Sequence, residues 1–366
     1  MRHAKASTPE ITAPNTAALA RYHAAFDWTM VFLSVWLLGG AYVDGWAHNH
    51  GKVDDTFFTP WHALFYSGYL VVACYLVGQS IRRIIRGAPW RQALPPGYGW
   101  SLAGAVIFWF GGVGDLIWHT LFGIEEDVDA LFSPTHLTLA VAVWLIVGGP
   151  FRAAWHRAHD ATASAVTQLP MLLSAAFMLS TITFIIQIAH PLSNHWIGGD
   201  MPSFHPWLYQ EMGVMTFLWD AALLTSFILF LIRRGHLLPG AFTMLLTINA
   251  IGMGFLLTGQ PFPVEHLYAR IAAGIIADLL YVWLRPSTQR LRALRGFAFA
   301  VPVLTTATYV LAVDLTEGLW WSIHLWAGVM VLTGVVGLLC SYLLVPPLGS
   351  LDANQFSTDK PGTLRK

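Results

Sequence analysis

Two short stretches of this chain each combine aspartate and histidine at spacings that suit metal binding. The first runs from Asp44 to His62, DGWAHNHGKVDDTFFTPWH, and the second from Asp115 to His136, DLIWHTLFGIEEDVDALFSPTH. Each stretch opens with Asp-x-x-x-His and ends with a histidine two residues after a proline. Carboxylate and imidazole ligands without a thiolate suit copper, iron, zinc or manganese better than a sulfur-preferring site.

The spacing of each Asp-x-x-x-His pair fits one face of a helix. Asp44 and His48 are four residues apart, and so are Asp115 and His119. Residues at positions i and i+4 are neighbours on a helical surface. Each pair can therefore bind one metal ion from the same side of its helix.

The histidine that closes each stretch lies at the start of a returning helix. His62 and His136 each follow a proline, and proline is favoured in the first turn because that turn needs no N–H donor. Each hairpin thus offers one carboxylate and two imidazoles, which leave coordination positions open as in catalytic metal sites. If the two hairpins lie close together, they can hold two metal ions that act on one substrate. The candidate ligands are Asp44, His48, His62, Asp115, His119 and His136.

Any one of these residues has a simpler explanation. Histidines near a membrane interface commonly form structural hydrogen bonds, and aspartates in loops are commonly solvated. That explanation weakens here because the same triad occurs twice at matched positions. Ionisable groups within a membrane are also costly and usually functional. We therefore interpret the six residues as metal ligands.

The elements that must position these ligands are membrane helices. Of 366 residues, 55% are hydrophobic and 11% are charged, whereas soluble domains carry roughly 25% charged residues. Apolar runs recur along the chain, and about 20 apolar residues cross a bilayer as a helix. We expect an all-α membrane bundle of about ten transmembrane helices, arranged as five hairpins with an internal repeat. The expected spans are 26–46, 59–82, 98–121, 134–154, 168–189, 209–232, 238–259, 265–284, 297–314 and 321–344.

Charged residues in the connections predict the orientation of the helices. Arginines gather in alternate connections, whereas the intervening connections hold one cation, Lys52. The positive-inside rule therefore places both termini in the cytoplasm and every hairpin tip on the opposite side. In a bacterial inner membrane, the candidate metal ligands then face the periplasm.

Composition narrows the partners and the redox chemistry. The net charge is zero, so we expect no nucleic-acid partner, and the lipid bilayer is the expected surrounding. Cys74 and Cys340 both lie in apolar runs, which argues against a disulfide framework. The segment 1–25 lacks the apolar core of a signal peptide, and we expect it and the segment 346–366 to be cytoplasmic tails.

The ligand-bearing hairpins form an internal repeat. Asp44 and Asp115 are 71 residues apart, and further steps of this length reach Gln187 and Thr258 near the ends of later spans. We interpret the first two hairpins as copies that retain the full ligand set and the later ones as copies that lost or changed it. The prolines where the returning helices start are Pro60, Pro134, Pro206 and Pro263.

The end of the first stretch continues as DTFFTPWHALFY, and this motif is similar to one in a known family. The C subunit of the copper membrane monooxygenases, the particulate methane and ammonia monooxygenase family, carries Asp-x-x-x-His followed by Asp-Thr-x-Phe-Thr-Pro-x-His-x-x-x-Phe-Tyr. The corresponding residues here are Asp55, Thr56, Phe58, Thr59, Pro60, His62, Phe65 and Tyr66. The resemblance covers the first four spans, about residues 26–158. It implies one metal site at Asp44, His48 and His62 and an adjacent site at Asp115, His119 and His136.

The resemblance also implies a cofactor and partners. It implies copper, as one or two ions, and the ligand types leave iron and zinc as alternatives. It further implies oxidation of a small apolar substrate or of ammonia, with partner membrane subunits or a homo-oligomer. The chain departs from the family at Asp115, where the family has an asparagine, and the added charge favours a harder or higher-valent ion. The six spans within residues 159–345 have no counterpart, and acidic residues extend the second stretch: Glu125, Glu126, Asp127 and Asp129.

Three functions fit these features. The first is a copper monooxygenase-like oxidative enzyme or its metal-binding subunit, and the second is a metal or proton transporter with the Asp/His cluster as its outer vestibule. The third is a non-catalytic subunit or assembly factor, which predicts a closed site without a pocket. Transport predicts a polar path around Asp220, Arg270 and Asp278, unless Arg270 forms a structural pair with one of these aspartates. An enzyme predicts polar groups confined to the outer third above an apolar pocket, and the nearly uncharged first four spans favour this confinement.

Other residues near the hairpin tips have less specific roles. His50 and Asp54 lack counterparts in the second stretch, so we expect them to be solvated or to form outer hydrogen bonds. Asp55 is expected to cap the returning helix or to orient His62. The aromatic residues at the tips either line a pocket or form an interfacial belt: Trp46, Trp61, Trp118, Phe57, Phe58 and Phe122. A further cluster at the same face would comprise His190, His195, His205, His266 and His324, whose spacing shows no repeat.

Overall fold

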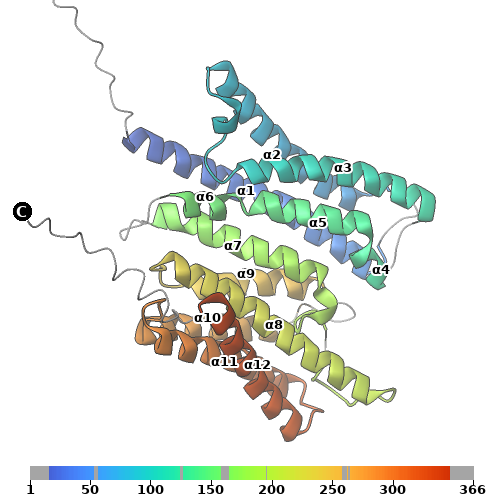
Figure 1. The fold of residues 1–366 in the computed structure, drawn as a ribbon. Helices are drawn as coiled ribbons and strands as arrows, with labels where there is room; N and C mark the ends of the chain where they lie inside the picture. Colours follow the sequence, from blue (N-terminus) through green and yellow to red (C-terminus); the bar gives the residue numbers. More distant parts are fainter. Residues whose placement is uncertain are drawn as a thin grey trace, which may run out of the picture.

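The computed structural model of the chain is built from α-helices (Figure 1). It describes residues 16–52, 57–123, 127–157, 165–194, 196–257, 262 and 264–346. These residues contain no β-strand, so the expected all-α fold is confirmed. The α-helices are α1 (Thr16–Asn49), α2 (Pro60–Ile85), α3 (Gly99–Phe122), α4 (Asp127–Phe132), α5 (Pro134–Val147), α6 (Gly149–His156), α7 (Ala165–Ile185), α8 (Pro206–Arg234), α9 (Ala241–Phe255), α10 (Val264–Leu284), α11 (Leu291–Thr316) and α12 (Ile323–Leu344). Two short 3-10 helices are η1 (Trp90–Gln92) and η2 (Gln187–Ala189).

The helices fit a multi-pass membrane protein. Within the described ranges, 8 helices are long and apolar enough to cross a membrane: α1, α2, α3, α7, α8, α10, α11 and α12. α5 and α6 pass the same test together but are bent by 43°, because Pro150 in the first turn of α6 has no N–H to continue the helix. α9 lies within the expected span 238–259 but has 15 residues, fewer than the about 20 that a straight crossing needs.

The first helix is longer than its apolar run predicts. α1 begins at Thr16, inside the expected 1–25 tail, because the alanine-rich segment before the span favours helix. Residues 1–15 and 347–366, which make up most of both expected tails, lie outside the described residues.

α7 joins two groups of helices. It packs against α1, α5 and α6 on one side and against α8 and α9 on the other. In Figure 1, α1–α6 lie above α7 and α8–α12 lie below it. Of its apolar window, 72% is buried, the largest share among the candidate spans. The four-helix region that carries the candidate ligands is therefore backed by a buried fifth span.

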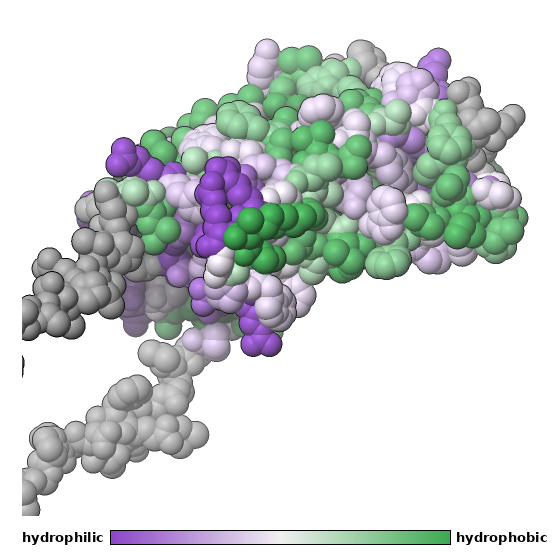
Figure 2. Space-filling view, turned by 90° about the horizontal axis from the view of Figure 1, so that it is seen from above, coloured by the Kyte–Doolittle hydropathy of each residue, from purple (hydrophilic) through white to green (hydrophobic). Residues whose placement is uncertain are grey.

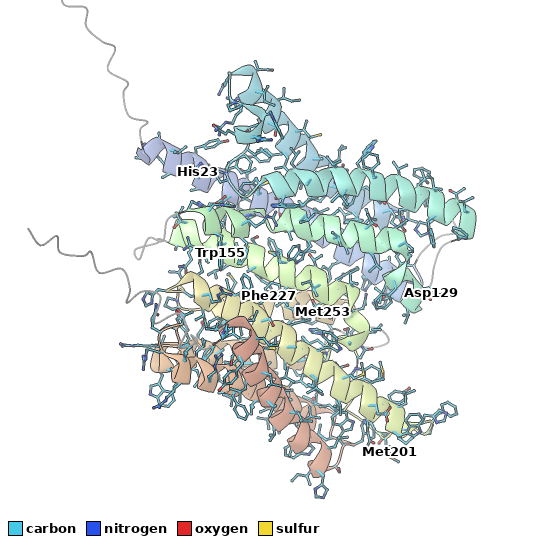
Figure 3. All side chains as sticks on the ribbon, viewed as in Figure 1. His23, Asp129, Trp155, Met201, Phe227 and Met253 are labelled. Carbon is cyan, nitrogen blue, oxygen red and sulfur yellow. The ribbon has the colours of Figure 1, made fainter. Side chains whose placement is uncertain are left out.

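The surface and the two ends of the bundle differ in character. Large apolar side chains such as Phe32, Trp109 and Phe110 are exposed on the helices, and Figure 2 shows hydrophobic residues across much of one face, with the most hydrophilic ones mainly toward one end. In Figure 3, His23 and Asp129 mark opposite ends of the bundle. We call the end with Asp129 the site end, because both ligand stretches lie there.

Close helix crossings position the first ligand pair. A Cβ atom at Gly40 would lie 2.7 Å from the Cα of Phe65, and one at Gly68 would lie 2.8 Å from the Cα of Leu37. Only glycine therefore lets α1 and α2 approach this closely, as small residues do at membrane helix interfaces. Asp44 lies one turn beyond Gly40, so the crossing brings it opposite the start of α2.

The second ligand pair rests on a matching crossing. A Cβ atom at Gly111 in α3 would lie 3.2 Å from the Cδ2 of Leu139 in α5. Asp115 follows Gly111 by four residues, as Asp44 follows Gly40. The two hairpins therefore repeat in their packing as well as in their sequence.

Candidate metal centre

The returning helices α2 and α5 begin with the same cap. The side chain of Thr59 accepts a hydrogen bond from the backbone N–H of His62 at 3.1 Å. Ser133 does the same for His136 at 3.3 Å. A proline occupies the first turn in both helices, and such caps fix where a helix starts. Both histidines are thus the third residue of their helix, and their rings point back past its start.

Each capped histidine has one ring nitrogen fixed by a backbone carbonyl. The Nδ1 of His62 lies 2.7 Å from the carbonyl oxygen of Phe57, and the Nδ1 of His136 contacts the carbonyl oxygen of Ala130. A carbonyl oxygen only accepts, so Nδ1 must carry the proton in both rings. In the neutral imidazole, Nε2 then presents a lone pair. This is the usual way in which proteins orient a histidine for a metal ion.

The carboxylates of α1 and α3 face these Nε2 atoms. The Nε2 of His62 lies 3.5 Å from the Oδ2 of Asp44. The Nε2 of His136 lies 3.2 Å from the Oδ1 of Asp115, and the Nε2 of His119 lies 3.5 Å from the same oxygen. A ring nitrogen and a carboxylate oxygen face each other favourably when Nε2 also carries a proton, as in imidazolium, or when a metal ion lies between the two atoms. Two ligands bound at about 2.0–2.1 Å in a tetrahedral site stand about 3.4 Å apart, which matches these separations.

His48 completes the first group. The nitrogen and oxygen donors of Asp44, His48 and His62 all lie within 4.8 Å of one another, and the same holds for Asp115, His119 and His136. Among the described residues, the Nδ1 of His48 and the Oδ1 of Asp44 are buried without a hydrogen-bond partner. Buried polar atoms are nearly always satisfied, so such exceptions point to an ion or water. The two predicted triads are therefore both assembled.

The two triads adjoin each other. Ring centroids are separated by 5.9 Å from His48 to His62, by 6.1 Å from His62 to His119 and by 5.5 Å from His119 to His136. The four imidazoles thus form a continuous row across the ends of α1, α2, α3 and α5. His119 stands between the two capped histidines, which keeps the two candidate ions near each other.

Tyr66 links the two hairpins at the centre. Its hydroxyl donates a hydrogen bond of 3.0 Å to the Oδ2 of Asp115, whose side chain is 1% exposed. Tyr66 follows His62 by one helical turn, so α2 contributes a ligand to one triad and orients the carboxylate of the other. The sequence motif includes this tyrosine, but its partner on α3 depends on how the helices cross. The hydrogen bond was therefore not predicted.

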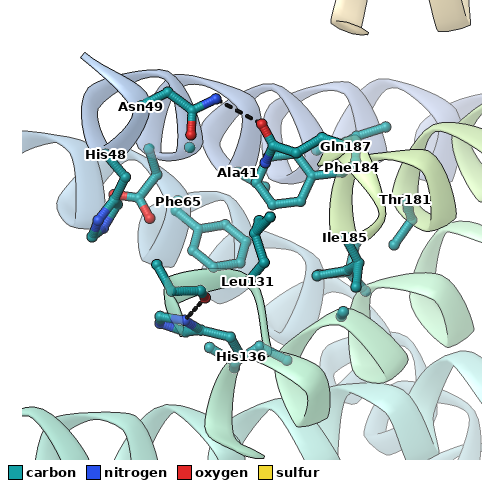
Figure 4. Close-up of a pocket in the computed structure, with 17 residues that line it drawn as sticks. Ala41, His48, Asn49, Phe65, Leu131, His136, Thr181, Phe184, Ile185 and Gln187 are labelled. Carbon is teal, nitrogen blue, oxygen red and sulfur yellow. Dashed lines mark hydrogen bonds between the residues drawn. The ribbon is translucent and has the colours of Figure 1, made fainter. Parts of the chain in front are cut away.

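A pocket opens beside the row of imidazoles. Asp44, His48, His136, Asn49 and Gln187 are polar residues on its wall, and apolar residues of α1, α2, α4, α5 and α7 form most of the rest (Figure 4). Its volume of about 80 Å³ suits several waters or one very small molecule. α7 supplies Phe184, and beyond its end lies Gln187, the repeat counterpart of Asp44. The pocket therefore extends beyond the expected 26–158 region.

Gln187 is held in place by α1. The Nδ2 of Asn49 donates to the Oε1 of Gln187 at 2.6 Å and to the carbonyl oxygen of Leu256 at 3.0 Å. This contact between α1 and the end of α7 was not predicted, although the repeat spacing had singled out Gln187. A long-range contact of this kind leaves no periodic signal in the sequence.

Some of the other predicted residues near the tips contact the site or its neighbours, and others are exposed. The Nδ1 of His50 lies 2.8 Å from the carbonyl oxygen of Trp46, and its ring stacks on Trp46, so it forms an outer hydrogen bond as expected. Phe57 stacks on His62 at 4.9 Å between centroids and so belongs to the site. Phe58 is 82% exposed, in keeping with an interfacial belt. Among the predicted residues near the tips, those outside the described residues are Asp54, Asp55, Glu125, Glu126 and His195, and the side chain of Asp127 is likewise not described. The cap of α2 that was expected of Asp55 is formed by Thr59.

The three charged residues that a transport path would use, Asp220, Arg270 and Asp278, are bound to local partners. Arg270 donates to the Oδ2 of Asp220 at 2.7 Å, and the Nε2 of His190 lies 3.6 Å from the Oδ1 of the same aspartate. Asp278 in α10 accepts from the backbone N–H groups of Phe242 at 3.2 Å and of Thr243 at 3.0 Å at the start of α9. Of the two expected partners for Arg270, Asp220 is therefore correct.

Comparison of the chain with protein-family models, curated proteins and solved structures finds no match. The likeness to the copper monooxygenases thus rests on the residues of the first two hairpins alone.

Proposed function

We propose that this chain is a membrane metalloprotein whose two adjacent Asp/His triads bind first-row transition-metal ions for oxidative chemistry. The observation that carries the proposal is the orientation of the capped histidines. Their Nδ1 atoms are bound to carbonyl oxygens, and their Nε2 atoms face the carboxylates of Asp44 and Asp115. When each imidazole is neutral, this orientation lets its Nε2 atom and the facing carboxylate oxygen bind the same metal ion in each of the two neighbouring triads.

The donor set and the sequence likeness favour copper, as an enzyme or as its metal-binding subunit. Imidazole with a carboxylate accommodates copper, iron or zinc, and no thiolate lies in either triad. The bound ions would supply the redox and oxygen chemistry. The protein residues would hold the ions, leave coordination positions open and keep the reaction away from bulk water.

The pocket supports a small apolar substrate. Its polar side is formed by ligand residues, and most of its remaining lining is apolar, including Leu38, Phe65 and Leu139. A volume of about 80 Å³ admits a molecule of the size of ammonia or a short alkane more readily than a large one. The adjoining apolar pocket supports an enzyme over a closed structural site.

The mid-bundle charges offer less support for the transporter alternative. Asp220 is paired with Arg270, and Asp278 caps α9. Both contacts tie helices together within the described residues, and a transport path would need such groups accessible to water or a moving ion. We therefore favour the enzyme, or its subunit, over a transporter.

The membrane orientation belongs to the same proposal. The positive-inside rule places both termini in the cytoplasm, so the site end would face the periplasm of a bacterial inner membrane. Partner membrane subunits would supply the electrons that such oxidation requires.

Oxygen-dependent turnover in membranes tests this function. Membranes that contain the full chain and its native partners would be supplied with ammonia or a short alkane, and hydroxylated product would be measured. The expected result is product with the unmodified chain and with His50→Ala, which removes a non-ligand histidine one helical turn from Trp46. We expect loss of product with His48→Ala and with His119→Ala.

Two results would oppose the proposal. Full product formation by both ligand variants would separate the triads from catalysis. Metal-dependent uptake of an ion into vesicles, abolished by the same variants, would favour the transporter instead.

A further inference from the structure

A third group of metal-ligand side chains lies in the second half of the chain. It comprises Glu265 and His266 in the first turn of α10 and Glu317 at the end of α11. Their donor atoms all lie within 4.8 Å of one another, as do those of each triad in the first half. The spans of residues 159–345 thus carry ligand chemistry of their own.

The third group is built like the first two. His266 is the third residue of α10, as His62 is of α2 and His136 is of α5. In each case the histidine faces a carboxylate near the C-terminal end of a neighbouring helix, which here is Glu317 at the end of α11. This placement follows from topology, because helices that start and helices that end alternate at the site end. The same local design therefore recurs with a different carboxylate.

The imidazole of His266 is buried and faces Glu317. The residue is 1% exposed, and its Nε2 lies 3.7 Å from the Oε1 of Glu317. This separation exceeds that of a hydrogen bond and is close to the about 3.4 Å between two ligands of a tetrahedral ion. The ring of Tyr309 lies 4.9 Å away between centroids, and its hydroxyl donates to the carbonyl oxygen of Pro191 at 2.7 Å. The imidazole is thus packed against a ring that is itself anchored.

The loop before α8 positions Glu317. A Cβ atom at Gly198 would lie 2.5 Å from the Oε2 of Glu317 and 2.8 Å from the Cγ1 of Val313, so the glycine lets this loop pack closely against the end of α11. The backbone N–H of Gly199 donates to the carbonyl oxygen of Gly318 at 3.1 Å, and Gly198 forms a bridge with Leu319. The backbone that directly follows Glu317 is therefore paired with the loop that contains Gly198.

The nearest buried cation on α10 is engaged elsewhere. Arg270 lies one turn beyond His266 and binds Asp220. Glu265 and Glu317 place two carboxylates beside the buried imidazole of His266, and carboxylate and imidazole donors together suit a divalent first-row cation. Glu317 retains 29% side-chain exposure, so an ion in solution can reach the group from the site end.

We propose that Glu265, His266 and Glu317 form a third metal site, which binds a divalent first-row cation. Two carboxylates and one imidazole are a harder ligand set than Asp/His/His, and this set favours manganese, iron(II) or zinc over copper. Three protein ligands leave positions open for water or a small anion. The site does not depend on the two triads and would remain if they bound nothing.

Manganese binding by a chain without functional triads tests this site. The full chain with His48→Ala and His119→Ala would be purified in detergent, stripped with a chelator and titrated with Mn²⁺. Free Mn²⁺ would be followed by its electron paramagnetic resonance signal. The expected result is one saturable site, and Glu317→Gln or Glu265→Gln should weaken it by at least about 100-fold, since loss of a direct ligand exceeds the loss of an outer contact.

A matched control separates ligation from surface charge. Asp314→Asn removes an exposed carboxylate from the same helix, one turn before Glu317, and should leave the affinity within about twofold, because an exposed charge acts weakly through water. Thermal unfolding of the metal-free proteins checks that the isosteric glutamine variants still fold. The site is refuted if the chain shows no saturable binding of Mn²⁺ or Zn²⁺, or if Asp314→Asn weakens binding as much as Glu317→Gln does.

Discussion

Tyr66→Phe is the most informative single change at the candidate metal centre. The tyrosine is not a ligand, and the substitution removes one oxygen atom while keeping the ring that packs beside Phe108 at 5.6 Å between centroids. What is lost is the hydrogen bond of 3.0 Å to the Oδ2 of Asp115. Without this hydrogen bond, the carboxylate of Asp115 is less firmly oriented, and we expect it to bind its metal ion more weakly.

The size of the effect follows from the environment of Asp115. Its side chain is 1% exposed, so water cannot readily replace the lost donor. A hydrogen bond to a charged group contributes about 1.5–3 kcal/mol, and outer hydrogen bonds of metal ligands typically change affinity by about 10–100-fold. The two ranges agree, because about 1.4 kcal/mol corresponds to a tenfold change in affinity. We expect metal affinity at the second triad to fall within this range.

Competition with a chelator of known affinity measures this loss on the purified full chain. Tyr69→Phe is the matched control, because Tyr69 lies on the same helix and donates to the carbonyl oxygen of Ala105 at 2.9 Å, away from both triads. It should lower the melting temperature without changing metal affinity. Equal affinity in Tyr66→Phe and in the unmodified chain would refute the role given to Asp115.

Three further predictions address packing, capping and pH. Gly112→Ala would place a Cβ atom 2.7 Å from the Cε1 of Tyr66 and so displace the tyrosine ring from Asp115. It removes no polar atom, yet it should weaken metal binding about as much as Tyr66→Phe does, as measured by the same chelator competition. Asp278→Asn should lower the free energy of unfolding by about 1–2 kcal/mol, because it weakens the cap of α9, and should leave metal content unchanged in elemental analysis. Burial lowers the pKa of His190 to about 4, so the unfolded chain binds this proton more readily. Stability should therefore hold above pH about 6.5 and fall by up to about 3 kcal/mol as the pH decreases toward 4, and melting temperatures across this range should show a smaller decrease in His190→Gln.

Local patterns allowed the ligands to be predicted. A proline in the first turn predicts where α2 and α5 start, and the position of His62 and His136 follows from that start. The four-residue spacing places Asp115 and His119 on one face of α3. These features depend on neighbours within one helical turn, so the sequence contains the information needed to predict them.

Features that depend on helix packing could not be predicted. The hydrogen bond from Tyr66 to Asp115 joins two helices, and Gln187 reaches the pocket because α7 packs behind α1 and α5. The cluster that contains His266 and Glu317 combines residues from two helix ends whose spacing shows no repeat. Such contacts depend on crossing positions that small residues set one by one, and no short motif encodes them.

The metal-to-protein ratio after single and paired histidine changes tests the central claim most directly. The full chain would be loaded with copper, treated with a chelator to remove loosely held ions and analysed for metal and protein. The account predicts two tightly held ions, one for each triad, and the loss of one ion in either His62→Ala or His136→Ala. It predicts the loss of both ions when the two changes are combined. An unchanged ratio in the combined variant, with the protein still folded, would contradict the assignment of these residues as metal ligands.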